Sequence, residues 1–221
     1  MTVRGGFAGE LESLRLQVEV MTIRVADAVM GARTLLESGD ADLAQTLVDA
    51  DDAIDDMHTS LEEQCYRLLA REAPVAADLR LVVSVIRVLH ELERIGDLAL
   101  RVLKSIDDIP LIAAHREVYE LLLGLADNVV ARFLAVQRGW SESSIEPLEA
   151  LDESDPLARF ADPLVNQLMA LTGPDSVRVA LAAMYIGRSF DRIGDHTQIM
   201  ASRLQYLVTG DSAHLAEEVA W

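Results

Sequence analysis

Apolar residues recur along the chain at the three- and four-residue spacings of an α-helix. Between Phe7 and Glu37 they form one stripe: Leu11, Leu14, Val18, Met21, Val25, Ala28 and Leu35. This spacing is typical of a helix that packs one face into a bundle. Glycine or proline follows each such segment in the first half, and both residues commonly mark helix ends. We therefore predict three long helices there: Phe7–Glu37, Ala41–Arg71 and Ala76–Asp107.

The second half repeats this plan with one irregular member. We expect a helix over Leu111–Arg138 ended by Gly139, and another over Asp175–Thr209 ended by Gly210. The segment between them contains Pro147, Pro156 and Pro163, and each proline removes a backbone donor, so its helix should start late or kink. Asp155-Pro156 and Asp162-Pro163 have the form of an N-cap followed by Pro at the first helical position. A short helical or disordered tail should follow Asp211.

Matching residues in the two halves indicate a duplication. Gly39 corresponds to Gly139, and after a shorter proline loop Arg80 corresponds to Arg178. Three helices thus follow three helices, and we predict an all-α protein of six long helices in two tandem three-helix repeats. The first repeat covers residues 1–109, and the second, with the short C-terminal tail, covers residues 110–221.

Each repeat ends with the same acidic motif, which points to cation binding. The motifs are Glu93-Arg94-Ile95-Gly96-Asp97 and Asp191-Arg192-Ile193-Gly194-Asp195. Residues four apart lie on one face of a helix, so each motif can present two carboxylates together. Hard oxygen donors suit Mg²⁺, Mn²⁺, Ca²⁺ or iron. Alternatively, the acids form a solvated face and the two motif arginines act as local counter-charges.

The preceding helix carries further carboxylates, Asp52, Asp55 and Asp56. If these two helices are antiparallel neighbours, Asp55 and Glu93 lie equally far from Pro74, so their carboxylates could meet across the groove. His90 and His196 are candidate nitrogen ligands, or else packed side chains. The motif glycines, which cost roughly 1 kcal/mol in a helix, indicate a close approach by a ligand or by another helix.

Composition excludes several functions. The formal charge of −18 disfavours direct nucleic-acid binding, and a single cysteine, Cys65, excludes an intramolecular disulfide. The N-terminus does not resemble a signal peptide, and charges interrupt every apolar stretch before it could span a membrane, so we expect a cytoplasmic protein. No phosphate loop, nucleophile elbow or di-iron Glu-x-x-His pattern is present. The high apolar content, 51%, favours a partner surface and a homodimer.

From about Phe7 to Val208, the paired motifs, the duplication and the segment lengths resemble the PhoU family of phosphate-signalling proteins. The resemblance implies two three-helix bundles related by pseudo-twofold symmetry. It also implies a non-enzymatic negative regulator of phosphate uptake and starvation signalling. Its partners would be the ATPase component of a phosphate ABC transporter and a sensor histidine kinase, with membrane association only through these partners.

The resemblance further implies divalent or trivalent metal ions at the motif carboxylates, multinuclear iron among them, with Mg, Mn or Zn as alternatives. Two hypotheses from other classes stay open: a carboxylate-bridged iron or manganese enzyme, and a helical scaffold without metal. The implied metal ligands fall into two sets, one in each repeat: Asp52, Asp55, Glu93 and Asp97, and Asp152, Asp155, Asp191 and Asp195.

Overall fold

The protein is an all-helical bundle in a computed structural model that describes residues 3–149 and 158–219. Five of its helices are long, and no strand occurs within those residues. The α-helices are α1 Val3–Ser38, α2 Ala41–Glu72, α3 Ala76–Leu103, α4 Ile109–Ala113, α5 Arg116–Glu142, α6 Glu146–Glu149, α7 Ala158–Met169 and α8 Ser176–Thr209. Two 3-10 helices, Ile106–Asp108 and Ser212–Val219, complete the described elements.

The helix ends follow from local capping. Gly39 has φ +64°, which ends α1, and the Asp40 carboxylate then accepts a hydrogen bond from Asp42 N at 2.9 Å to cap α2. Ala73 adopts a left-handed conformation before Pro74, and Gly210 does the same after α8. The predicted boundaries of α1, α2 and α8 are confirmed to within a few residues.

Other boundaries differ from the prediction. Helix α3 ends at Leu103, and Pro110 lies in the first turn of α4, where its missing N–H costs nothing. Helix α5 starts only at Arg116, because His115 leaves the helical region with φ −104° and ψ 79°. In α7, Pro163 lies inside the helix, so of the two candidate start points Asp162-Pro163 is not the start, and Asp155-Pro156 lies outside the described residues. Burial of Leu164 and Leu168 in the core offsets the lost backbone bond.

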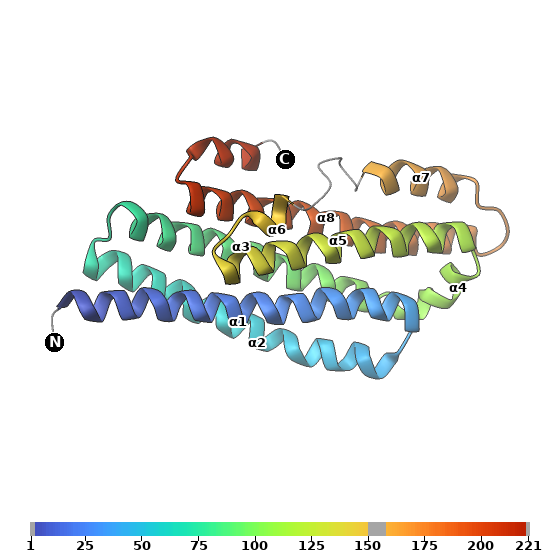
Figure 1. Cartoon of the computed structure of the whole chain (residues 1–221). Helices are drawn as coiled ribbons and strands as arrows, with labels where there is room; N and C mark the ends of the chain where they lie inside the picture. The colour runs from blue at the N-terminus through green and yellow to red at the C-terminus, as the bar shows by residue number, and fades with distance from the viewer. Residues whose placement is uncertain (1–2, 150–157, 220–221) are drawn as a thin grey trace.

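Contacts between the repeats join equivalent helices. Within the first repeat α1, α2 and α3 pack on one another, and within the second α5, α7 and α8 do so. Across the repeats α3 packs on α8 and α1 on α5, which lie side by side in Figure 1. Equivalent elements meet in this way when a twofold axis relates two units. The expected pair of three-helix bundles with pseudo-twofold symmetry is present, although short α6 and α7 occupy the place of one long helix.

One continuous core fills the space between these helices. Its fully buried side chains come from both repeats, among them Leu14, Met21, Ile95, Phe133 and Phe190. No described helix combines the length with the apolar composition needed to cross a membrane. The boundary predicted between residues 109 and 110 falls at the start of α4, which packs on both α5 and α8.

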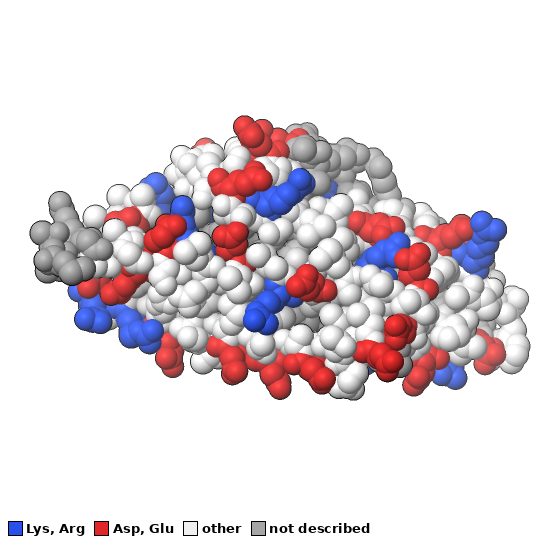
Figure 2. Space-filling model, turned by 60° about the horizontal axis from the view of Figure 1, so that its bottom comes forward, with Lys and Arg blue, Asp and Glu red and all other residues white. Residues whose placement is uncertain are grey.

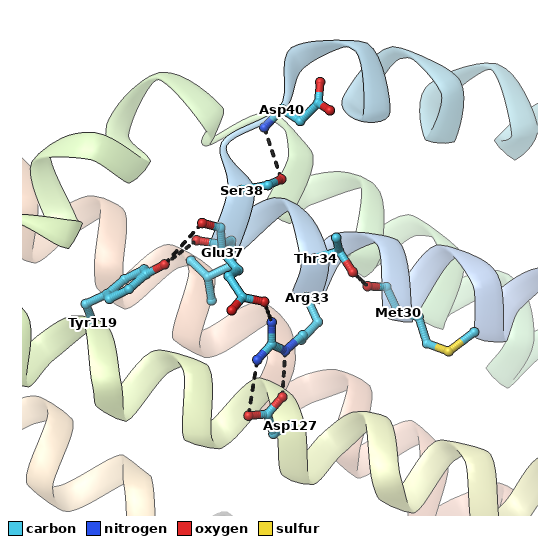
Figure 3. Close-up of polar contacts among 9 residues, drawn as sticks. Met30, Arg33, Thr34, Glu37, Ser38, Asp40, Tyr119 and Asp127 are labelled. Atoms are coloured by element: carbon cyan, nitrogen blue, oxygen red, sulfur yellow. Dashed lines mark hydrogen bonds and ion pairs between the residues drawn. The ribbon is translucent and has the colours of Figure 1, made fainter.

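Polar contacts also join α1 to α5, as Figure 3 shows. Arg33 Nε donates to Asp127 Oδ1 at 2.6 Å, and Arg33 also pairs with Glu37 on its own helix. The hydrogen bond to Asp127 raises the pKa of the Arg33 guanidinium. The Tyr119 hydroxyl donates to the Leu36 carbonyl at 3.2 Å, so the C-terminal turn of α1 is held by α5.

Candidate functional site

Helices α2 and α3 run antiparallel in the register that the sequence predicted. His58 Nε2 lies 3.3 Å from His90 Nδ1, which fixes the level at which the two helices meet. Asp55 precedes His58 by three residues and Glu93 follows His90 by three, so these two acids lie at the same level of the helix pair.

Asp51 of α2 is half-buried beside these residues and was not among the predicted ligands. Burial is the largest cause that raises the pKa of its carboxyl, followed by the charges of Asp55, Asp97 and Asp52, with Lys104 opposing them. Two of the predicted residues on α2 and one on α3 therefore share an electrostatic cluster with Asp51. We call Asp51, Asp52, Asp55 and Asp97 the first acidic cluster.

Gly96 of α3 lies next to one member of this cluster, Asp51. A Cβ built at Gly96 would be 3.7 Å from Asp51 Oδ1 and equally far from Ile54, which is ordinary van der Waals contact. Asp51 and Gly96 also line a small pocket of about 90 Å³ together with Arg24 and Asp27 of α1. The glycine is therefore not forced by a close helix approach, and Asp51 reaches the surface of α3 one residue before Asp97.

The four predicted ligands of the first repeat differ in exposure. Asp52 and Asp55 are exposed, whereas Glu93 and Asp97 are half-buried. Glu93 Oε2 lies 3.6 Å from Arg94 Nε, so a motif arginine does act as a counter-charge here. On the face that Figure 2 presents, acidic side chains outnumber basic ones, and several Lys or Arg side chains lie between them.

The second motif is neutralised more completely by its own helix. Asp191 pairs with Arg188, and Asp195 Oδ2 lies 3.5 Å from Arg192 Nη1. Burial and the Asp191 charge raise the pKa of the Asp195 carboxyl, while the two arginines lower it. The proposed partners of this pair, Asp152 and Asp155, lie outside the described residues.

Metal-ligating side chains do not converge in the described ranges, where no three His, Cys, Asp or Glu residues are arranged to hold a metal ion. The donor chemistry of the first acidic cluster nevertheless fits a hard cation, because it offers only carboxylate oxygens and their mutual repulsion penalises the ionised state. The cluster is thus a set of suitable donors without a closed coordination shell.

Both candidate histidines have other partners. His90 Nε2 lies 3.3 Å from Glu62 Oε1, in addition to its contact with His58. His196 Nδ1 lies 2.6 Å from Glu91 Oε2, and Arg87 Nη2 lies 3.1 Å from the other oxygen of this buried carboxylate. The contact between Glu91 and His196 joins α3 to α8 and therefore joins the two repeats.

Cys65 is unsuited to nucleophilic chemistry. It is fully buried, and burial followed by the charge of Glu62 raises the pKa of its thiol to about 12. The reactive species of a cysteine is the thiolate, which is scarce at neutral pH when the pKa is that high.

Comparison with known proteins agrees with the duplicated helical plan. The family model described as the PhoU domain matches residues 18–106. The phosphate-specific transport system accessory protein PhoU of Edwardsiella tarda is 31% identical over 96% of this chain and 88% of the relative. That of Escherichia coli K12 is 30% identical over 94% and 87%. The crystal structure of PhoU from Pseudomonas aeruginosa superposes with a TM-score of 0.82 at 29% identity, covering 93% of this chain and 100% of that one.

The fold and the site define a class of helical protein: a duplicated three-helix bundle that carries an acidic motif in each repeat. The residues matched by the family model include the whole first motif, Glu93 to Asp97. This chain belongs to the PhoU family. The resemblance seen in the sequence is therefore confirmed.

Proposed function

We propose that this protein is the accessory regulator of a phosphate-specific transport system and represses phosphate uptake and starvation signalling from the cytoplasm. The observation that carries the proposal is identity of about 30% to PhoU accessory proteins over nearly the whole of both chains. Relatives of this kind are named as accessory proteins, so we assign the chain a regulatory role without turnover.

Protein contact is the mechanism we assign. Leu16, Val20 and Ile23 lie on one face of α1 at spacings of four and three residues, and each is exposed. An exposed apolar stripe of this kind commonly marks an interaction surface. We assign as partners the ATPase component of a phosphate ABC transporter, a sensor histidine kinase and a second copy of this chain.

Partner capture tests this proposal. The full chain, immobilised under phosphate-replete conditions, should retain the transporter ATPase and the kinase sensor domain. A variant with Leu16→Glu and Ile23→Glu should retain less of both, since charge on the α1 stripe opposes its burial against a partner. The matched control is Val48→Glu on α2, which is exposed outside that stripe. Failure of the unaltered chain to retain either partner would contradict the proposal.

A hard cation at the first acidic cluster is the second part of the proposal. It is supported by the three carboxylates that gather around Asp51, with Glu93 at the level of Asp55. Iron, in one or several ions, Mn²⁺, Mg²⁺ and Zn²⁺ are the candidates. Asp191 and Asp195, with Asp152 and Asp155, form the candidate site of the second repeat, and we rank it lower because Arg188 and Arg192 already neutralise it.

Asp51→Asn should stabilise the metal-free protein at neutral pH by up to about 1 kcal/mol, the range of partly exposed charge interactions. The folded-state pKa of Asp51 is raised, so the folded protein binds the proton more tightly than the unfolded chain does. Its ionisation therefore costs stability as the pH rises through that pKa. The gain from Asn should be present at neutral pH and vanish below the ordinary carboxyl pKa of about 3.8. Urea unfolding in chelator at several pH values measures it.

Adding Mn²⁺ should make the wild type more stable than Asp51→Asn, the reverse of the metal-free order. An ion that binds only the folded state raises the melting temperature, and loss of Asp51 removes a ligand. The matched control Glu63→Gln, an exposed acid on the same helix, should leave the response to Mn²⁺ unchanged. An equal response of wild type and Asp51→Asn would contradict metal binding at this cluster while leaving the regulatory role intact.

A further inference from the structure

A pocket of about 390 Å³ lies between α3 and α8 and gathers positive charge in an acidic protein. Four arginines line it: Arg94, Arg101, Arg188 and Arg192. Tyr185, Ser189, His196 and Leu98 complete the wall, and Asp97 is its one carboxylate. The whole chain has 19 Lys and Arg against 37 Asp and Glu, and four of these basic residues gather around this one space.

The pocket brings together equivalent arginines of the two repeats. Arg94 and Arg192 are the second residues of the two acidic motifs, far apart in the sequence, yet both line this one space. They meet because α3 and α8, the helices that carry the motifs, pack against each other. Arg94 and Arg192 therefore each lie near a carboxylate of their own helix and also line the same pocket.

These guanidinium groups remain accessible to a ligand. The side chains of Arg94, Arg188 and Arg192 are 62%, 62% and 51% exposed, although each lies near a carboxylate of its own helix. Such exposed ion pairs contribute about 0–1 kcal/mol, and a guanidinium has five N–H donors to share. Within the described part of the chain Arg101 has no ion-pair partner, which leaves its donors to the pocket.

From this arrangement we infer that the pocket binds a chain of two or more phosphoryl groups, carried either by a nucleotide or by an inorganic oligophosphate. Arginine pairs with phosphate through two parallel hydrogen bonds, which suits several guanidinium groups around a polyanion. Arg188 and Arg192 are one helical turn apart, and Arg94 and Arg101 are two turns apart, or about 10 Å. The cations are thus spread along both walls of the pocket instead of being gathered at one point.

The volume argues against orthophosphate as the ligand of best fit. Pockets of about 300–1,000 Å³ hold molecules of cofactor or drug size, and this pocket falls in that range. The exposed ring of Tyr185 offers a surface on which a nucleotide base can stack. The concave shape favours a small molecule over an acidic protein segment.

Calorimetric titration of the full chain in chelator tests the inference and keeps it separate from metal binding at the first acidic cluster. Tripolyphosphate and ATP are titrated in parallel, with orthophosphate as the short anion. We expect saturable binding of at least one of the two longer ligands, stronger than that of orthophosphate and weaker at high salt. If ATP binds more tightly than tripolyphosphate, we assign the difference to contact between the base and Tyr185. If the two bind equally, the phosphates alone are recognised.

Arg101→Gln should weaken this binding roughly tenfold or more, the effect of losing a hydrogen bond to a charged group. Arg101 is exposed, so the variant should keep the melting temperature of the wild type. The matched control is Arg116→Gln, an exposed arginine of α5 that pairs with Glu120 and does not line the pocket. Three outcomes overturn the inference: no saturation by either long phosphate, an equal loss in the control, or tighter Arg101-dependent binding of polyglutamate.

Discussion

Replacing His196 by alanine should lower the free energy of unfolding by about 2–3 kcal/mol. His196 donates to the buried Glu91 carboxylate across the interface between α3 and α8, and the Glu91 side chain is only 4% exposed. Removing a hydrogen-bond donor leaves the buried carboxylate short of a partner, which costs about 1–3 kcal/mol and more for a charged group. Arg87 still contacts the other carboxylate oxygen at 3.1 Å, so we place the loss within that range. Equilibrium urea unfolding measures the effect.

The interface between α3 and α8 should tolerate removal of the Glu91 charge. In Glu91→Leu the buried position becomes apolar, and both former partners can reach water, since Arg87 is 43% and His196 is 23% exposed. Replacement of a buried ion pair by apolar side chains is often close to neutral. In the Glu91→Leu background, His196→Ala should then cost little. His115→Ala, whose side chain makes no capping bond, serves as the histidine control. Equal losses from His196→Ala in both backgrounds would exclude coupling between the two residues.

Gly139→Ala should destabilise the protein by about 1–3 kcal/mol, the usual cost of overpacking. The chain folds back over Gly139 at the end of α5: Ser143 takes φ +51°, Ser144 N donates to the Gly139 carbonyl at 3.0 Å, and Ser143 N donates to Trp140 O. This is the Schellman arrangement, with Ser143 as its left-handed residue. A Cβ at Gly139 would lie 2.8 Å from the Ser144 backbone oxygen and 2.5 Å from Leu204 Cδ2. Thermal and urea unfolding measure the loss.

Gly96→Ala is the matched substitution with the opposite expected sign. Alanine is favoured over glycine inside a helix by roughly 1 kcal/mol, and the nearest atoms to a new Cβ are 3.7 Å away. The metal-free protein should therefore gain up to about 1 kcal/mol. If Gly96→Ala lowered the free energy of unfolding as much as Gly139→Ala, the space that we infer around Gly96 would be excluded.

Helix periodicity predicted most of the fold because the apolar stripes are long. The stripe of α1, from Leu11 to Leu35, is buried almost throughout. The boundaries that failed depend on geometry beyond the local pattern. Gly139 was expected to end α5, but the left-handed position belongs to Ser143, and Gly139 is needed for the space beneath that turn. A glycine in the sequence therefore does not show whether it ends the helix or leaves space for a turn. The conformation of the residues that follow decides this.

The candidate site was harder to predict, because it depends on which faces of α2 and α3 meet. A signal for Asp51 was present: Ile54, Leu61, Cys65 and Leu68 form the buried stripe of α2. Extending the stripe by one step toward the N-terminus reaches Asp51, a half-buried carboxylate on the same face of the helix. Glu91 gave no comparable signal, because its partner His196 comes from the other repeat.

The packing of α3 on α8 and of α1 on α5 has a consequence for how such a chain can arise. Each interface joins a helix to the equivalent helix of the other repeat. Both repeats therefore use the same surface to contact each other. A single ancestral repeat could then pair with a second molecule of itself through the same faces. In that pair, two copies of one arginine would face each other where Arg94 and Arg192 now line a common pocket. Fusion of the two copies would keep this meeting point and free the outer helices to diverge.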